Sequence, residues 1–173
     1  SFEGLDVPPT LVSFATAIGN TRDVQSPEFK KANSAVVMLR PQYKDGLPEI
    51  GSLIAIYKTV EQMIEEGKVL SAATPGYGGV AEALFKMCVG NHVGLQLSND
   101  LNFNDLFKPA YGSVILELLD PSAGEFLGFT TVDYTLEAGK EMIDLAKLQE
   151  KWEAKLEPVF PYRKAGPTVP ALE

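Results

Sequence analysis

A glycine-rich turn at residues 74–79, with the string TPGYGG, separates a predicted strand at residues 69–73 from a predicted helix. The free N–H groups at the start of a helix carry partial positive charge, and glycines let a phosphate approach the backbone closely. The segment therefore predicts phosphate or nucleotide contact at Gly76, Gly78 and Gly79. The alternative is a purely structural turn that needs glycine for its dihedral angles.

Two well-defined phosphate motifs do not describe this turn. Gly76-x-Gly78-x-x-Ala81 matches the start of a dinucleotide-binding fingerprint, and Asp100 follows at a suitable separation. Only one such unit is present, however, and the last two predicted strands are joined by a turn rather than a helix. The turn also lacks the Gly-Lys-Ser/Thr string of a Walker A loop.

The remaining pattern predicts an α/β (α+β) fold: a mixed, largely antiparallel sheet with helices packed on it. Predicted strands cover residues 11–18, 35–39, 69–73, 94–97, 113–119 and 125–132. Turn residues at 120–124 predict that the last two strands form a hairpin.

Predicted helices cover residues 48–66, 79–89 and 144–156, with Asp144 as the cap of the last one. Apolar residues recur at spacings of three and four in the first helix, which predicts one core-facing stripe. Its members are Ile50, Leu53, Ile54, Tyr57, Val60 and Ile64.

Charge and composition exclude several classes of partner and site. The net charge is −8, and an acidic surface repels phosphate backbones and anionic lipid, so we expect neither nucleic acid nor membrane as a partner. Because Cys88 is the only cysteine and His92 the only histidine, we predict no zinc site and no Cys–His nucleophile pair. We assign no catalytic residue and no metal ligand, and we expect a cytoplasmic protein.

The C-terminal stretch is rich in proline. Residues 158–173 contain Pro158, Pro161, Pro167 and Pro170, which is typical of a spacer. We therefore divide the chain into a domain at 1–157 and a linker or tail at 158–173, and we expect the domain to be a piece of a larger ATP-using enzyme.

Several strings resemble the C-terminal domains of the aminoimidazole ribonucleotide synthetase superfamily. TPGYGGVAEALFKM is similar to that family's segment Asp-x-Ser-Asp-Gly-Gly-Leu-x-x-Ala-Leu, with Gly78-Gly79-Val80 on Gly-Gly-Leu and Ala83-Leu84 on the helix. DLFKPAYGSVILEL and FLGFTTVD resemble its later strands. The strings SPEFK and LEPVFP narrow the resemblance to the phosphoribosylformylglycinamidine synthases, in their second synthetase half.

This resemblance implies a fragment of an ATP- and glutamine-dependent ligase of purine synthesis. Such an enzyme converts formylglycinamide ribonucleotide to the amidine, with ATP and Mg²⁺ in the full enzyme. The implied partners are the enzyme's other domains, a barrel-forming synthetase domain and a glutaminase domain. The isolated chain is then expected to be inactive, with no cofactor certain for this domain.

The chain departs from the family pattern at the turn. The family's acidic positions fall on Thr74 and Tyr77, and its serine falls on Gly76, so no metal role is carried over. Two alternatives stay open. One is a structural or interaction domain with no ligand site of its own, and the other is a nucleotide-binding, kinase-like member of the same superfamily.

Overall fold

The computed structural model describes residue 4, residues 8–121 and residues 123–159. Within them, seven strands form the main sheet: β1 (Ala35–Leu39), β4 (Val69–Ala73), β5 (Gly94–Leu97), β6 (Val114–Leu118), β7 (Glu125–Thr131), β8 (Thr135–Ala138) and β9 (Glu141–Asp144). A small hairpin joins β2 (Tyr43–Lys44) to β3 (Leu47–Pro48). The helices are η1 (Thr21–Asp23), α1 (Ile50–Glu65), α2 (Gly79–Val89), η2 (Phe103–Phe107) and α3 (Leu145–Glu153). None of the helices in these ranges is long and apolar enough to cross a membrane.

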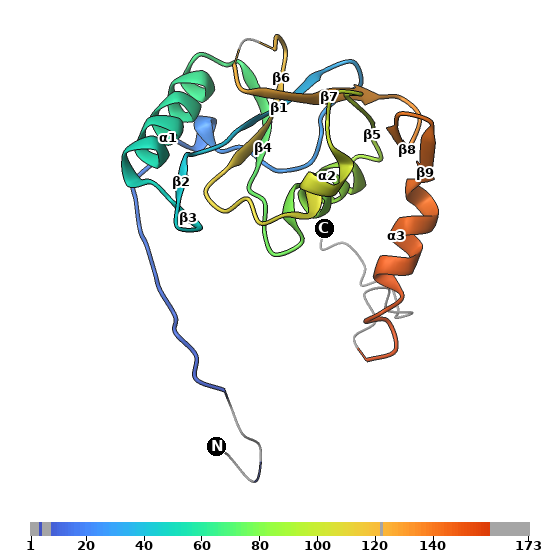
Figure 1. Cartoon of the computed structure of the whole chain (residues 1–173), viewed down its shortest axis with the longest axis horizontal. Helices are drawn as coiled ribbons and strands as arrows, with labels where there is room; N and C mark the ends of the chain where they lie inside the picture. Colours follow the sequence, from blue (N-terminus) through green and yellow to red (C-terminus); the bar gives the residue numbers. More distant parts are fainter. Residues whose placement is uncertain (1–3, 5–7, 122, 160–173) are drawn as a thin grey trace, which may run out of the picture.

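The sheet is mixed and largely antiparallel, as predicted. Its strand order is β4-β6-β1-β7-β5-β8-β9, and only the pairing of β5 with β8 is parallel. The helices lie on opposite sides of this sheet, with α1 apart from α2 and α3 (Figure 1).

Each face of the sheet has its own apolar core. On one face, α2 buries Val80, Leu84 and Met87 against the alternate side chains of β1, β5 and β7. On the other face, α1 buries Val60 and Met63 against β4, β6 and β1. Because α1 covers the β4–β6–β1 half of this face, no helix of the described residues lies over the β7–β5–β8 half.

The predicted hairpin between the last two long strands is wrong. β1 lies between β6 and β7, with Val37 opposite Leu116 on one side and opposite Phe126 on the other. Four of the five residues of β1 are buried, which suits the most apolar short strand to the centre of a sheet. The turn residues at 120–124 were read correctly as a connection, but that connection crosses over β1.

The prediction of a strand at residues 11–18 is not confirmed either. This segment is extended but pairs with no strand among the described residues, and Leu11 and Phe14 are 96% and 90% exposed. In Figure 1 the chain leaves the domain near α1 and runs away from it towards the N-terminus.

The single stripe predicted for α1 is split in the structure. Val60 is buried and Ile64 is partly buried, but Ile50, Ile54 and Tyr57 are exposed. The prediction omitted Met63, which is buried on the face of α1 that packs against the sheet, beside the partly buried Ile56. The apolar side chains of α1 therefore face two directions.

One buried carboxylate ties the loop before β1 to the sheet. Glu117 on β6 is fully buried, and its oxygens accept hydrogen bonds from the backbone N–H of Lys30 at 2.8 Å and from the Ser71 hydroxyl at 2.9 Å. The N–H of Lys31 donates to the same carboxylate at 3.3 Å. A buried charge is stable only when such donors compensate its lost hydration, so this loop is held in place.

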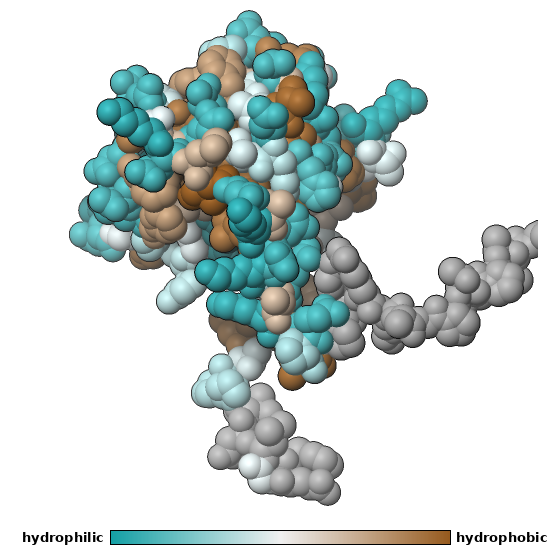
Figure 2. Space-filling model, turned by 90° about the vertical axis from the view of Figure 1, so that its right-hand side faces the viewer, coloured by the Kyte–Doolittle hydropathy of each residue, from teal (hydrophilic) through white to brown (hydrophobic). Residues whose placement is uncertain are grey.

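The C-terminal helix begins as predicted, because the Asp144 side chain accepts a hydrogen bond from the Lys147 N–H at 3.1 Å. Leu145 is fully buried, while Trp152 is half exposed and packs edge-on against Phe85 with ring centroids 5.7 Å apart. The face of the molecule that carries α3 is largely hydrophilic, with small apolar patches (Figure 2). The predicted linker boundary at residue 158 falls at the end of the described residues, and residues 160–173 lie outside them.

Candidate functional site

The glycine-rich turn connects β4 to α2, as predicted, and packs closely against η2. Gly79, the first residue of α2, has a φ of 71°. A Cβ atom there would lie 2.6 Å from the carbonyl oxygen of Leu106 and 2.8 Å from that of Lys108. Gly79 is therefore required both by its left-handed conformation and by the approach of the neighbouring backbone.

The start of α2 carries an anion that belongs to the chain itself. The N–H of Gly78 donates a 2.7 Å hydrogen bond to Oε2 of Glu82, one turn further along the helix. The other oxygen of Glu82 accepts a hydrogen bond from Lys86 Nζ at 2.6 Å. Lys86 and then the Gly78 amide hold the pKa of Glu82 below its usual value.

These contacts limit what the turn can bind. The Gly79 N–H donates to the Gly76 carbonyl at 3.1 Å, so the amides of both Gly78 and Gly79 already have acceptors. A phosphate at this helix start must displace the Glu82 carboxylate, which has the same sign of charge. Contact of Gly76, Gly78 and Gly79 with phosphate stays a prediction.

The turn also lacks the two acidic side chains that the family pattern has there. The acidic positions of the family pattern are Thr74 and the 94% exposed Tyr77. Within the described residues, no group of three or more His, Cys, Asp or Glu side chains is placed to hold a metal. The turn as folded therefore does not fit a magnesium–nucleotide complex.

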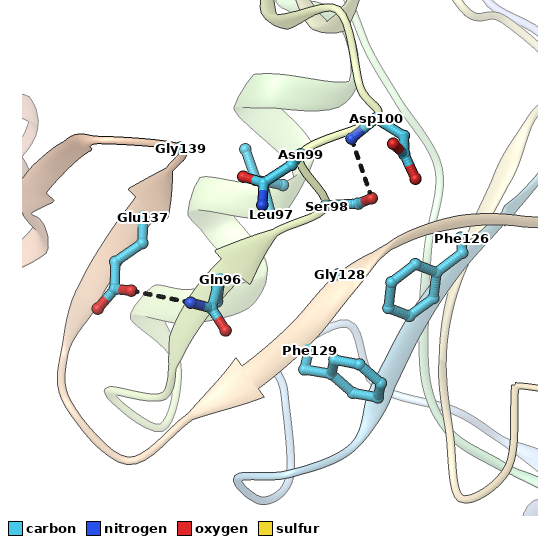
Figure 3. Close-up of a pocket in the computed structure, with 10 residues that line it drawn as sticks. All are labelled: Gln96, Leu97, Ser98, Asn99, Asp100, Phe126, Gly128, Phe129, Glu137 and Gly139. Atoms are coloured by element: carbon cyan, nitrogen blue, oxygen red, sulfur yellow. Dashed lines mark hydrogen bonds between the residues drawn. The ribbon is translucent and has the colours of Figure 1, made fainter.

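A pocket lies on the half of the sheet face that α1 leaves uncovered. It has a volume of about 430 Å³ and is lined by the end of β5 and by parts of β7 and β8. Figure 3 shows the phenyl rings of Phe126 and Phe129 on one side and the Gln96–Glu137 pair on the other. The ring centroids are 4.9 Å apart, and Gln96 Nε2 donates to Glu137 at 3.3 Å.

The lining of this pocket is aromatic and acidic. Asp100, Glu137, Asn99 and Gln96 supply carboxylate and amide groups, and the lining contains no Lys or Arg. Carboxylates repel phosphate, whereas hydroxyl or amino groups can donate to them. The pocket is therefore unsuited to a phosphate group.

The cysteine and the histidine considered in the sequence analysis make packing contacts in the structure. Cys88 is buried, and its desolvation raises the pKa of the thiol to about 12, so the sulfur is held as an unreactive thiol. His92 is exposed and lies against Tyr134, with ring centroids 4.9 Å apart.

Sequence reasoning missed Glu82 and Glu117, two carboxylates that accept hydrogen bonds from specific donors. Glu82 had a visible signal, because an acidic residue in the first turn of a helix often bonds to the free amides there. Glu117 had none, because its donors are 46, 86 and 87 residues away along the chain. Such a contact depends on which strands become neighbours.

Comparison with known proteins relates this fold to one enzyme. The chain is 33% identical over 88 residues to the phosphoribosylformylglycinamidine synthase subunit PurL of Methanocaldococcus jannaschii, a match that covers 47% of this chain and 12% of that protein. No family model matches the chain.

Solved structures give the same relationship at the level of the fold. Thermotoga maritima PurL complexed with FGAR matches 74% of this chain with a TM-score of 0.60 and 11% identity. The same protein complexed with ADP matches 87% of it with a TM-score of 0.59 and 13% identity. The chain spans 30% and 29% of those two chains. The predicted fold and the resemblance to phosphoribosylformylglycinamidine synthase are thus confirmed, as a partial match to a much longer protein.

Proposed function

We propose that this chain is one C-terminal-type domain of a phosphoribosylformylglycinamidine synthase. In that role it is part of a carbon–nitrogen ligase of purine synthesis, which uses ATP with Mg²⁺ and takes ammonia from glutamine. The chain's partners are then the barrel-forming synthetase domain and the glutaminase domain of the same cytoplasmic enzyme. The observation that carries the proposal is the coincidence of a sequence match with a fold match to the same protein.

The turn before α2 favours the second, degenerate synthetase half. An ATP-hydrolysing site must hold metal and neutralise the transferred phosphate. Here Thr74 and Tyr77 replace the acids of the family pattern, and Glu82 occupies the helix start. This domain then positions its neighbours and contributes no metal ligand of its own at this turn.

A structural domain without any ligand site is the second candidate, and the Gly78–Glu82 contact favours it. In that case the three glycines serve the turn and its packing against η2 alone. The two candidates differ in one measurable property, which is whether the turn binds phosphate once the Glu82 carboxylate has been removed.

Complementation tests the proposed enzyme. A purine auxotroph lacking phosphoribosylformylglycinamidine synthase should grow when it expresses the longer polypeptide that contains this chain. The same polypeptide without residues 21–157 should not restore growth. The purified 173-residue chain, supplied with formylglycinamide ribonucleotide, ATP, Mg²⁺ and ammonia, should form no amidine.

Failure of the intact, well-expressed polypeptide to restore growth would overturn the proposed enzyme. Amidine formation by the 173-residue chain alone would overturn the idea that it is only one part of the enzyme.

A further inference from the structure

Residues 11–18, LVSFATAI, have the pattern of a strand but pair with no strand among the residues that the structure describes. One side of an extended chain would carry Val12, Phe14, Thr16 and Ile18, and the other side would carry Leu11, Ser13, Ala15 and Ala17. Pro9 precedes the segment and Gly19 follows it, so both ends carry strand-breaking residues. Fully extended, eight residues span roughly 26 Å, enough for a complete strand.

This segment is exposed over its whole length. Ile18 and Phe14 are 105% and 90% exposed, and no charged side chain occurs between residues 8 and 20. Among the described residues, no backbone hydrogen bond involves residues 11–18. An uncharged, apolar segment with unpaired backbone groups aggregates unless another surface covers it.

The exposed side of α1 continues the same apolar surface. Ile54 and Tyr57 are 49% and 46% exposed, and together with Ile18 and Val24 they line a groove of about 810 Å³ between residues 18–24 and the helix. Charged side chains also line this groove: Asp23, Lys58, Glu61 and Glu65. The docking arm, defined here as residues 11–18, and the outer stripe of α1 thus meet at Ile18. A single partner can cover both.

The partner's chemistry follows from the arm. Backbone groups that are unpaired along a whole strand are satisfied by the edge of another sheet, and the alternating side chains then enter its core. The arm points away from this domain's own sheet (Figure 1). A second copy of the chain fits less well, because each copy carries a net charge of −8.

We infer that residues 11–18 form a strand in the sheet of an adjacent domain of the same polypeptide, with the outer stripe of α1 packed against that domain. The inference rests on the proposed function, since it requires the longer protein of which this chain spans 29–30% in the matched structures. The arm then belongs to the core of its neighbour and fixes this domain to it.

Hydrogen exchange measured by mass spectrometry tests the arm. In the 173-residue chain, the amides of residues 11–18 should exchange at the rate of an unstructured peptide. In the longer polypeptide, they should exchange at least about 100-fold more slowly, as expected for a paired strand. Equally fast exchange in both would overturn the inference. Protection in the 173-residue chain that increases with its concentration would also overturn it, in favour of pairing between copies.

A pair of substitutions tests the outer stripe of α1. Ile54→Glu should leave the melting temperature of the 173-residue chain within a few degrees of the original, yet reduce protection of the arm in the longer polypeptide about 10-fold. The control is Thr59→Glu on the opposite side of the helix, which should change neither quantity. Equal effects of the two substitutions on the arm would overturn the role of the stripe. Since growth of the auxotroph reports enzyme activity and exchange reports pairing, failure of either proposal is seen separately.

Discussion

The amide of Gly78 donates to the carboxylate of Glu82 across a distance of 2.7 Å, so the chain places its own negative charge where a phosphate would lie. This relationship separates a phosphate-binding turn from a turn that only resembles one. It also shows why the glycine pattern alone cannot distinguish the two. The glycine pattern predicts only the backbone conformation of the turn. The group that its amides bind is determined by the side chain of Glu82, one helical turn away.

Removing this carboxylate should reveal whether a phosphate site lies beneath it. Calorimetric titration of the 173-residue chain with Mg-ATP and Mg-ADP should show little binding. Glu82→Ala frees the Gly78 amide and removes the competing charge, so affinity should rise about 10-fold or more if the turn can hold phosphate. Gly78→Asp, added to Glu82→Ala, should abolish that gain. The absence of any binding to Glu82→Ala would contradict phosphate contact at this turn and support the structural candidate.

Gly79→Ala should destabilise the domain by about 2–4 kcal/mol, because a left-handed conformation costs about 1–2 kcal/mol and the added methyl group collides with backbone oxygens. Urea unfolding followed by circular dichroism measures the change. Gly76→Ala is the matched control in the same turn, since its φ is not positive and the nearest atom to an added Cβ is 4.0 Å away. We expect this control to cost less than about 1 kcal/mol. Equal costs would contradict the role assigned to the packing of Gly79 against η2.

Glu117→Ala should destabilise the domain by roughly 3 kcal/mol, because it leaves the buried Ser71 hydroxyl and the partly buried N–H groups of Lys30 and Lys31 without their acceptor. Ser71→Ala removes only one of those donors and should cost about 1–2 kcal/mol. Chemical denaturation of the two variants and of the double variant measures both costs and their coupling. Strict additivity would contradict the shared hydrogen-bond network, since Ser71 has no acceptor to lose once Glu117 is gone.

The free energy of unfolding at low pH should depend on the Glu28 carboxylate. Lys30 and Ser26 hydrogen-bond to this carboxylate and lower its pKa from 4.5 to about 2. A lowered pKa in the folded state means that this stabilisation is present above pH 4.5 and is lost as the pH falls towards 2. Glu28→Gln should therefore lose less stability over that interval than the original chain. NMR titration of the Glu28 side chain checks the pKa directly, and a midpoint near 4.5 would contradict the contact.

Patterns of apolar residues along the chain were sufficient to predict most of the central elements. β1, β4 and β5 occupy the predicted ranges, and α2 ends at Val89 as expected. These elements are short and bounded by Gly or Pro, so local backbone preferences and periodicity place their ends. The cap at Asp144 was predicted for the same reason, because its hydrogen bond spans only three residues.

The order of the strands in the sheet could not be predicted from these apolar patterns. β6 and β7 are separated by a short turn, which predicts a hairpin, but β1 takes the place between them. Burying the apolar side chains of β1 on both faces gains more than a local hairpin would, and that gain exists only after the chain collapses. The short strands β8 and β9 were missed because each has only four residues. β8 is mostly half-buried and β9 is exposed throughout, so neither leaves a clear apolar periodicity.

The sequence by itself determined the local elements, the acidic surface, and the resemblance to phosphoribosylformylglycinamidine synthase, because each of these depends on neighbouring residues or on sums over the chain. Only the tertiary structure decided that Glu82 occupies the helix start and that Glu117 holds the loop before β1. It also decided that α1 has an outward apolar stripe and that residues 11–18 pair with no strand in the described part of the chain. Those properties depend on which surfaces meet, and contacts between distant residues are set by the packing of the whole domain.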